Sequence, residues 1–339
     1  MKKSLIIIFA LNTIYLNAQI INSNKSTIAE FYDGQVKSIE INGAKVSSQF
    51  RLKKWANKYN YVNHPEIRSA SKNNSFFLNV GITNTSSFLN LNKFDFKENN
   101  GYIFGLTFQH SFSEIYLASD SLKNNPHKLK SFTLSLDYQR DKFDNFNPEN
   151  NLIDKATPNK LILKGAWSLY NFNYKENARF KYTWIPTLSS QVNIIGYNES
   201  NLQNYLINGN LTNLNDIVFT DNSIFDGKYG VVDNNIKSAQ ISFSLPIVPD
   251  KSFLKLPIFS PIPYFSYEVF DNNKPRLNGG FGLGLLSSTI VDSKSIKKDG
   301  GVYRKFNVPS FLTIGVDWNY QDGIGSKPNY FVSGSIKLK

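Results

Sequence analysis

The sequence predicts an all-β fold, an antiparallel transmembrane β-barrel of ten to fourteen strands, with twelve as the expected number. Three observations lead to this prediction. Apolar and polar residues alternate over stretches of about ten residues, which is the period of a strand with two different faces. Clusters of turn-forming residues separate these stretches. The mean hydropathy of −0.33 excludes a protein that crosses a membrane with several helices.

Four stretches alternate most clearly. In Tyr102–Phe112 the even positions carry Phe104, Leu106 and Phe108, whereas the odd positions carry Thr107 and Gln109. The same rule holds in the other three, which are Leu129–Gln139, Ser310–Gln321 and the run from Tyr330 to Leu338. Each stretch is therefore expected to be a strand with one apolar and one polar face.

Six further stretches fit the same period less cleanly, which brings the expected strands to ten. They are Ser75–Thr83, Leu161–Tyr174, Arg179–Tyr197, Ile236–Leu245, Ile262–Asn272 and Gly279–Ser288. Pro186 lies in the middle of one stretch and is expected to mark a bulge or a break, because proline cannot donate to a ladder. An additional hairpin would raise the number to twelve.

Strand length separates a membrane barrel from a soluble sandwich. An 11-residue strand at ~3.3 Å per residue is ~36 Å long, and a tilt of ~45° makes it cover ~25 Å, the height of the apolar band of a membrane barrel. In lipid every backbone N–H and C=O needs a partner within the protein, and a closed barrel provides one for each. We therefore expect apolar side chains outside and polar side chains in the lumen.

This arrangement assigns individual side chains to the lumen and to the membrane surface. The residues expected to line the lumen are Gln109, Asp137, Gln139, Lys164, Glu268, Asp317, Asn319 and Lys337. The aromatic residues expected at the two membrane interfaces are Tyr102, Phe112, Tyr138, Trp318, Tyr320 and Tyr330. The luminal carboxylates Asp137, Glu268 and Asp317 are expected to form structural ion pairs with lysines such as Lys164, Lys181 or Lys337, and a binding or selectivity role is the alternative.

The remaining segments are expected to lie outside the strands. The stretches Arg140–Lys160 and Asn198–Asn235 are interpreted as extended loops. If Lys175–Ala178 is a periplasmic turn, counting strands places Ser113–Lys128 and Thr289–Lys305 on the same side. Residues 75–339 are assigned to the barrel, and residues 19–74 to a luminal plug, a periplasmic extension or one further hairpin.

Residues 1–18 have the layout of a secretory signal peptide. Lys2 and Lys3 precede an apolar run from Leu5 to Leu11, and Ala18 offers a small residue for cleavage. The apolar run is too short to cross a bilayer. We therefore expect the chain to be exported.

The sequence offers few groups for catalysis or metal binding. It has no cysteine and three histidines. His64 and His127 lie in turn contexts with no acidic partner at ligand spacing, and His110 lies on the apolar face of its strand. Phe112 stands where a phospholipase-like pairing with His110 would need a serine. We therefore expect no catalytic residue, no metal site and no cofactor, and the protein is not expected to be an enzyme.

The signal peptide, the alternating strands, the Asn-rich loops and a strand that runs to the last residue together resemble the integral outer-membrane β-barrels of diderm bacteria. The resemblance is architectural, covers roughly residues 75–339 and implies an outer-membrane location. Outer-membrane lipids are then the expected partners, joined by other envelope proteins that contact the long loops. No nucleic acid is expected, because the excess lysines of an exported barrel meet lipid phosphates instead.

Three functions follow from such a barrel. The first is a non-catalytic subunit or docking scaffold of a larger cell-envelope complex, favoured by the modest strand number, the narrow lumen and the long loops. The second is a narrow, porin-like channel or transporter for a small solute. The third is an outer-membrane hydrolase, which rests on analogy of fold alone.

Overall fold

The protein was analysed as a computed structural model. The structure describes residues 18–21, 27–31, 38–42, 45–59, 67–84, 100–116, 127–149, 152–173, 182–197, 202–207, 217–219, 227–234, 236–249, 258–271, 273–286, 296–298, 301–303, 311–321 and 325–337. The expected signal peptide, apart from Ala18, and His64 lie outside these residues.

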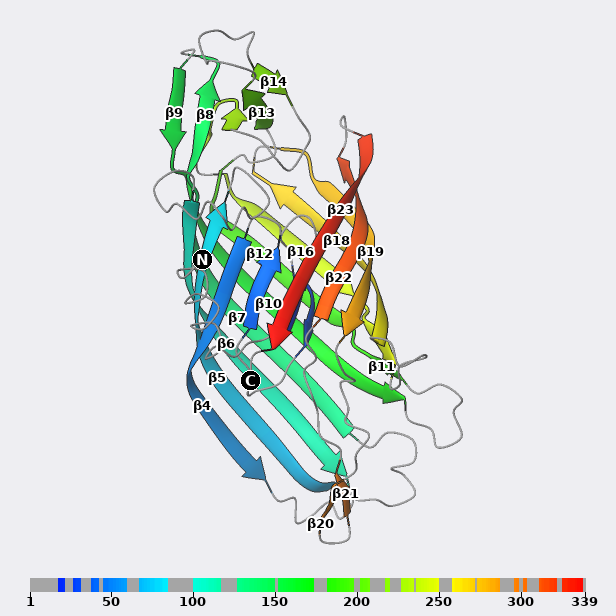
Figure 1. The fold of residues 1–339 in the computed structure, drawn as a ribbon. Helices are drawn as coiled ribbons and strands as arrows, with labels where there is room; N and C mark the ends of the chain where they lie inside the picture. The colour runs from blue at the N-terminus through cyan, green and yellow to red at the C-terminus, as the bar shows by residue number, and fades with distance from the viewer. Residues whose placement is uncertain are drawn as a thin grey trace, which may run out of the picture.

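The main body is an antiparallel sheet that closes on itself (Figure 1). Its strands are β3 (Ser38–Asn42), β4 (Lys45–Tyr59), β5 (Ile67–Asn84), β6 (Asn100–Tyr116), β7 (His127–Arg140), β10 (Asn159–Asn173), β12 (Thr187–Ile195), β16 (Ser238–Ser244), β18 (Ile258–Phe270), β19 (Arg276–Leu286), β22 (Phe311–Gln321) and β23 (Gly325–Lys337). Each pairs with its neighbour in this order, β23 also pairs with β3, and the pairing of β10 with β12 completes a ring of twelve strands.

The ring contains all ten expected strands, and its remaining two strands are β3 and β4. The assignment of residues 75–339 to the barrel therefore began too late, because paired strands start at Ser38. Of the three interpretations of residues 19–74, a further hairpin describes β3 and β4. The alternation in β3 spans only five residues, which is why the sequence gives it a weak signal.

Two strands of the ring are interrupted at prolines. Pro186 separates β11 (Tyr182–Trp184) from β12, and Pro246 separates β16 from β17 (Ile247–Pro249). The carbonyl oxygens of both prolines still accept backbone hydrogen bonds, from Leu169 N at 3.1 Å and from Ile185 N at 2.9 Å. The break expected at Pro186 is therefore confirmed, and the sheet continues past it through the pairing of β11 with β17.

Apolar side chains face outward and polar side chains face inward. Along β6, Phe104 and Leu106 are about half exposed, whereas Thr107 and Gln109 are buried. The seven residues of β16 alternate in the same way between buried hydroxyl or amide groups and exposed apolar groups. This is the reverse of a soluble sandwich and is the distribution of a barrel that is surrounded by lipid.

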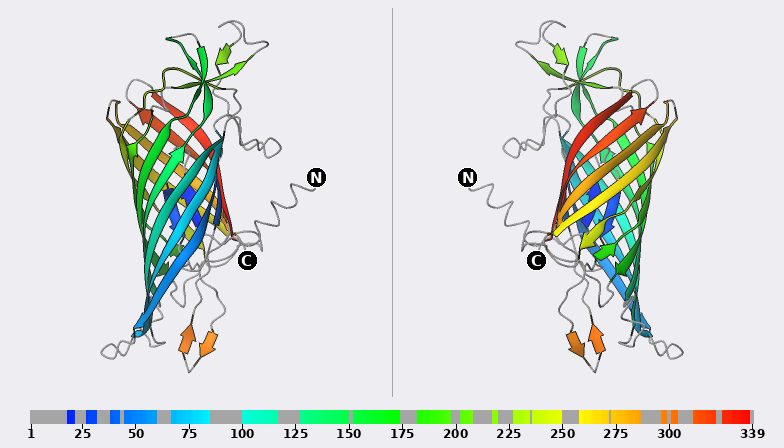
Figure 2. Two further views of the ribbon diagram at one scale, coloured as in Figure 1. Left: turned by 90° about the vertical axis from the view of Figure 1, so that its left-hand side faces the viewer. Right: turned by 90° about the vertical axis from the view of Figure 1, so that its right-hand side faces the viewer.

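The two segments expected to be extended loops form a second sheet. Strands β8 (Phe143–Asn147) and β9 (Leu152–Ala156) lie between β7 and β10, and β13 (Gln203–Ile207), β14 (Ile217–Phe219) and β15 (Gly227–Tyr229) lie between β12 and β16. They join in the order β14-β13-β15-β8-β9, with β15 and β8 parallel. We call this sheet the head; it stands beyond one end of the ring (Figure 2). The strands of the head pair with partners that are distant in the sequence. The composition of each segment, which is typical of a loop, therefore did not predict this pairing.

Two small hairpins complete the described chain. Strands β1 (Ala18–Ile21) and β2 (Thr27–Phe31) form a separate two-stranded sheet inside the ring, which we call the luminal hairpin (Figure 1). Strands β20 (Ile296–Lys298) and β21 (Gly301–Tyr303) form another, beyond the end of the ring opposite the head (Figure 2). The strand ends that flank residues 174–181, 117–126 and 287–295 all lie at this second end, in agreement with the counting of strands.

Candidate functional site

The inner wall of the ring is the part of the molecule with the densest set of buried polar groups. Five of the residues expected in the lumen, Gln109, Asp137, Gln139, Glu268 and Asp317, are at most 7% exposed, and Lys164 and Asn319 are partly buried. All seven lie on the inward face of their strands. Lys337 lies in β23, where it pairs with Ser38, and its side chain is outside the described part of the structure.

A first polar cluster is centred on Asp137 of β7. Its carboxylate forms an ion pair with Lys164 Nζ at 3.2 Å and accepts a hydrogen bond from Asn79 Nδ2 at 2.8 Å. Asn79 Nδ2 also lies 2.8 Å from Thr107 Oγ1. Gly105 lies opposite Asp137, and a Cβ atom there would collide with the carboxylate. The cluster therefore ties four neighbouring strands together at one place on the wall.

A second cluster lies on β18 and β19. Glu268 accepts a hydrogen bond from Arg276 Nη2 at 2.9 Å and another from Ser238 Oγ at 3.3 Å. Ser238 Oγ in turn accepts a hydrogen bond from Asn193 Nδ2 at 2.7 Å. Both charged groups are thus neutralised by a partner on the adjacent strand, as buried charges require. The expected ion pairs of the lumen are therefore present at Asp137 and Glu268, although Arg276 rather than a lysine pairs with Glu268.

A third polar contact joins two strands of the wall that are not neighbours and passes over a glycine of the strand between them. Tyr264 of β18 donates a hydrogen bond to Asp317 Oδ2 of β22 at 3.1 Å, although β19 lies between the two strands. Gly280 occupies the position between them, and a Cβ atom there would lie 2.5 Å from the tyrosine ring and 2.7 Å from the carbonyl oxygen of Val316. The glycine-rich stretch of β19 therefore permits close packing.

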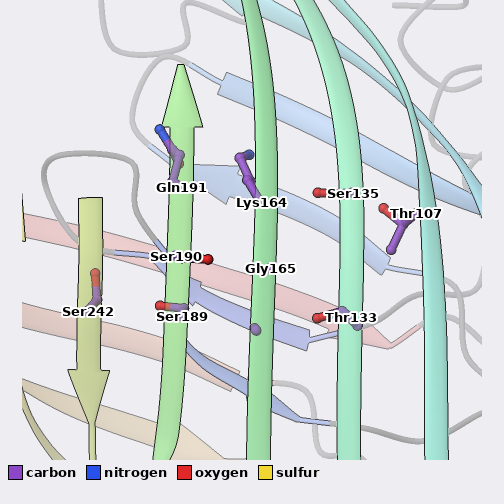
Figure 3. Close-up of a pocket in the computed structure, with 10 residues that line it drawn as sticks. Thr107, Thr133, Ser135, Lys164, Gly165, Ser189, Ser190, Gln191 and Ser242 are labelled. Atoms are coloured by element: carbon purple, nitrogen blue, oxygen red, sulfur yellow. The ribbon is translucent and has the colours of Figure 1, made fainter. Parts of the chain in front are cut away.

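The described part of the wall has a small hollow beside Lys164. Its volume is about 20 Å³, roughly enough for one water molecule. Its lining is Thr107, Thr133, Ser135, Lys164, Gly165, Ala166, Ser189, Ser190, Gln191 and Ser242, mostly hydroxyl and amide groups (Figure 3). This hollow can hold water or a single polar group, and it is too small to enclose a sugar or a larger solute.

The outer surface carries the aromatic residues expected at the interfaces. Tyr102, Trp318, Tyr320 and Tyr330 are exposed, and Phe112 and Tyr138 are partly buried. Tyr102 and Tyr138 lie side by side near the head end of β6 and β7, with ring centroids 6.1 Å apart. Sequence reasoning missed Trp55 of β4, whose ring contacts Phe76 and lies under Lys53 Nζ. It was missed because β4 was not assigned to the barrel.

A cluster around Asp141 joins the head to the rim of the ring. The side chain of Asp141 is buried and accepts hydrogen bonds from Gln139 Nε2 at 2.8 Å and Tyr197 Oη at 3.0 Å. Lys160 Nζ lies 3.7 Å from the same carboxylate and 4.4 Å from the centre of the Tyr197 ring. Only Gln139 was assigned a luminal position from the sequence, since Asp141 and Tyr197 lay in or beside supposed loops.

The head has its own small core, formed by Phe143, Tyr197 and Leu202 with Ala156 and Val232 packed against them. Lys228 is buried and lies 5.5 Å from the centre of the Phe143 ring. Among the described residues of the head, four apolar side chains nevertheless remain exposed, namely Leu152, Val218, Phe219 and Val231. A folded core fixes the position of these groups relative to the rim.

Among the described residues, no group of three or more histidine, cysteine, aspartate or glutamate side chains is placed to hold a metal ion. His110 faces outward, and its Nδ1 lies 2.6 Å from Asn74 Oδ1, while the side chain of His127 is outside the described part. No helix in the described part of the chain is long and apolar enough to cross a membrane.

Comparisons with known proteins give weak structural likeness. No family model and no curated protein matches the chain. Among solved structures, the chain is similar to the crystal structure of the β domain of the Bordetella autotransporter BrkA. The sequence identity is 8%, the TM-score is 0.36, and the match covers 89% of this chain and 97% of that one.

Proposed function

We propose that the protein is a non-catalytic integral outer-membrane β-barrel that acts as a docking scaffold in a larger cell-envelope complex. The observation that carries the proposal is the head, a folded sheet built on two connections of the ring. A connection that only links two strands needs no core of its own. A head with a core costs chain length and ordering entropy, which a surface for a partner would justify.

The exposed apolar groups of the head support a protein partner. Phe104, Leu106 and the other outward residues of the ring meet lipid. The head stands beyond the end of the ring (Figure 2), so lipid does not account for the exposure of Val218 and Phe219, at 47% and 53%. Large apolar side chains that are exposed beyond the membrane can serve as protein contact sites. The cluster around Asp141 would hold these side chains at a constant height above the membrane.

The condition of the lumen also favours a scaffold over an open channel. Asp137 and Glu268 form ion pairs with charged groups of neighbouring strands, and the hollow beside Lys164 has room for about one water molecule. Apolar side chains such as Phe77 and Ile262 also face inward and are fully buried. A barrel with such a lumen contributes mainly its outer surface and its ends.

Outer-membrane location and export through residues 1–18 are part of the proposal. The lipid-facing apolar surface and the closed strand ring support a place in a membrane. Membrane fractionation together with N-terminal sequencing of the mature protein tests this part. Recovery of the protein in the soluble fraction, or of an intact Met1 terminus in the outer membrane, would argue against it.

The scaffold role is tested by co-purification after mild detergent extraction of membranes. The wild type is compared with the double variant Val218→Ser/Phe219→Ser, and Asp154→Ser on the exposed strand β9 serves as the polar control in the same head. We expect specific companions with the wild type and the control, and their loss with the double variant. A lone monomer under every extraction condition would contradict the scaffold.

A narrow channel is the second candidate, favoured by the continuous polar wall and the hollow beside Lys164. Conductance of the wild-type barrel in planar bilayers decides between the two, because a scaffold with a filled lumen gives no steps above background. Turnover of lipid or peptide by the purified protein would instead support the outer-membrane hydrolase.

A further inference from the structure

The luminal hairpin lies across the interior of the ring. Cα atoms of β2 come within 8 Å of those of β10, β12 and β16, and Cα atoms of β1 come within 8 Å of those of β23 and β3. These two groups of strands lie on opposite walls, separated by three strands on one side and four on the other. A two-stranded hairpin can neighbour both walls only from inside the ring, as Figure 2 shows.

The lumen of a ring of twelve strands is filled only if something besides the side chains of the wall occupies it. About eight strands leave an interior that side chains alone can fill, and the diameter grows roughly in proportion to strand number. The wall next to β2 carries small side chains, namely Ala166, Ser168, Thr187, Ser189, Ser242 and Ser244. All are at most 8% exposed, although short side chains on the wall of an open lumen would be wet. They are therefore covered, and β2 is the neighbouring described strand on that side.

The luminal hairpin is not part of the ladder that holds the ring together. Among the described strands, β1 and β2 are hydrogen-bonded only to each other. Buried groups of the wall also lack hydrogen-bond partners in the described part of the chain, for example Ser244 Oγ on β16, a strand beside β2. Burying such groups without partners is unfavourable, and water would satisfy them if the hairpin left.

We propose that the luminal hairpin is a displaceable plug, and that its departure opens the ring to ions and small polar solutes. The polar wall that would then line the passage includes Lys164 and the hydroxyl groups of β10, β12 and β16. This inference goes beyond the scaffold role and does not depend on it, because a docking surface on the head and a plug in the lumen use different residues.

Planar-bilayer conductance tests the plug with two variants. One lacks residues 20–31, and the other has Thr27–Phe31 replaced by Gly-Ser-Gly-Ser-Gly, which keeps the chain length and removes the strand propensity. The matched control replaces Gly301–Tyr303 by Gly-Ser-Gly, because β20 and β21 form a comparable hairpin outside the ring. We expect conductance steps from both hairpin variants and none from the wild type or the control.

Thiol labelling gives a second measurement that leaves the hairpin intact. The chain has no cysteine, so Ser189→Cys and Ser242→Cys each place one thiol on the wall beside β2. Lys155→Cys on the head, where the lysine side chain is 48% exposed, is the accessible reference. A water-soluble maleimide should label the wall thiols slowly, and deletion of residues 20–31 should accelerate their labelling about tenfold or more without affecting the reference.

The outcomes separate the two proposals. Folded hairpin variants that give no steps and keep their wall thiols protected would overturn the plug, as would rapid labelling of the wall thiols with the hairpin intact. Conductance of the wild type would overturn the plug and the scaffold's filled lumen together. If the head variant loses its co-purifying proteins while its conductance is unchanged, the result supports the scaffold and does not bear on the plug.

Discussion

At the scale of single residues, small side chains on the inner wall decide which polar groups can meet. Tyr264 and Asp317 lie on strands that are not neighbours, and they touch because Gly280 between them has no side chain. Gly105 makes the same allowance for the carboxylate of Asp137. Polar contacts in the lumen therefore depend on glycines, which leave space for these contacts without making a side-chain hydrogen bond themselves.

Gly280→Ala is expected to destabilise the barrel by about 1–3 kcal/mol, because the new methyl group must displace the Tyr264 ring and break its bond to Asp317. Gly279→Ala is the matched control, since a Cβ atom at Gly279 meets nothing within 4 Å. Urea unfolding in lipid vesicles measures the difference. Equal stability of the two variants would contradict the close packing seen at Gly280.

At the scale of strands, the alternation in β6 sets which side chains meet lipid. Leu106 and Tyr102 face the same way, but Leu106 lies farther from the head end of the strand. Thr107 faces the lumen, where it is 1% exposed and bonded to Asn79. An arginine at position 107 would therefore collide with the packed inner wall. The effect of an arginine at Leu106 is better compared with that of an arginine at another outward residue.

Leu106→Arg should cost ~2–4 kcal/mol if the side chain lies near the middle of the membrane, whereas Tyr102→Arg at the interface should cost ~0–1 kcal/mol. The measurement is the free energy of unfolding of each variant in vesicles against the wild type. Similar costs at the two positions would contradict the placement of Tyr102 at the interface and of Leu106 at mid-depth.

At the scale of the whole molecule, β3 is the strand that closes the ring between the two ends of the chain. It has five residues and pairs with β23 on one side and β4 on the other. Both of its edges are therefore occupied, unlike those of the short hairpin strands β20 and β21. A membrane barrel cannot leave such a seam open, because lipid offers no hydrogen bonds to a free strand edge.

Ile41→Pro should weaken this seam, because proline removes a backbone donor from a strand that is paired on both sides. We expect the folded form to lose its compact, fast migration in SDS gels at a lower temperature than the wild type. Lys297→Pro in the separate hairpin of β20 and β21 is the control and should leave this temperature unchanged. An equal shift for both variants would show that β3 does not hold the ring closed.

The sequence by itself determined the facing of the strands. Alternation in segments such as Tyr102–Phe112 is local, so it predicted the all-β class, the inverted distribution of side chains and ten of the twelve strands. The placement of Gln109, Asp137 and Asp317 on the inner wall followed from the same period. The approximate number of strands followed too, because the expected ten needed only one further hairpin.

Only the tertiary structure decided which segments pair over long distances. The head unites residues 143–156 with residues 203–229, and the hydrogen bond between Tyr197 and Asp141 joins residues that are 56 positions apart. The luminal hairpin likewise lies between strands from both ends of the chain. The physical reason is that the alternation within a segment determines which of its side chains face lipid. The strand with which a segment pairs, in contrast, depends on the arrangement of the whole chain.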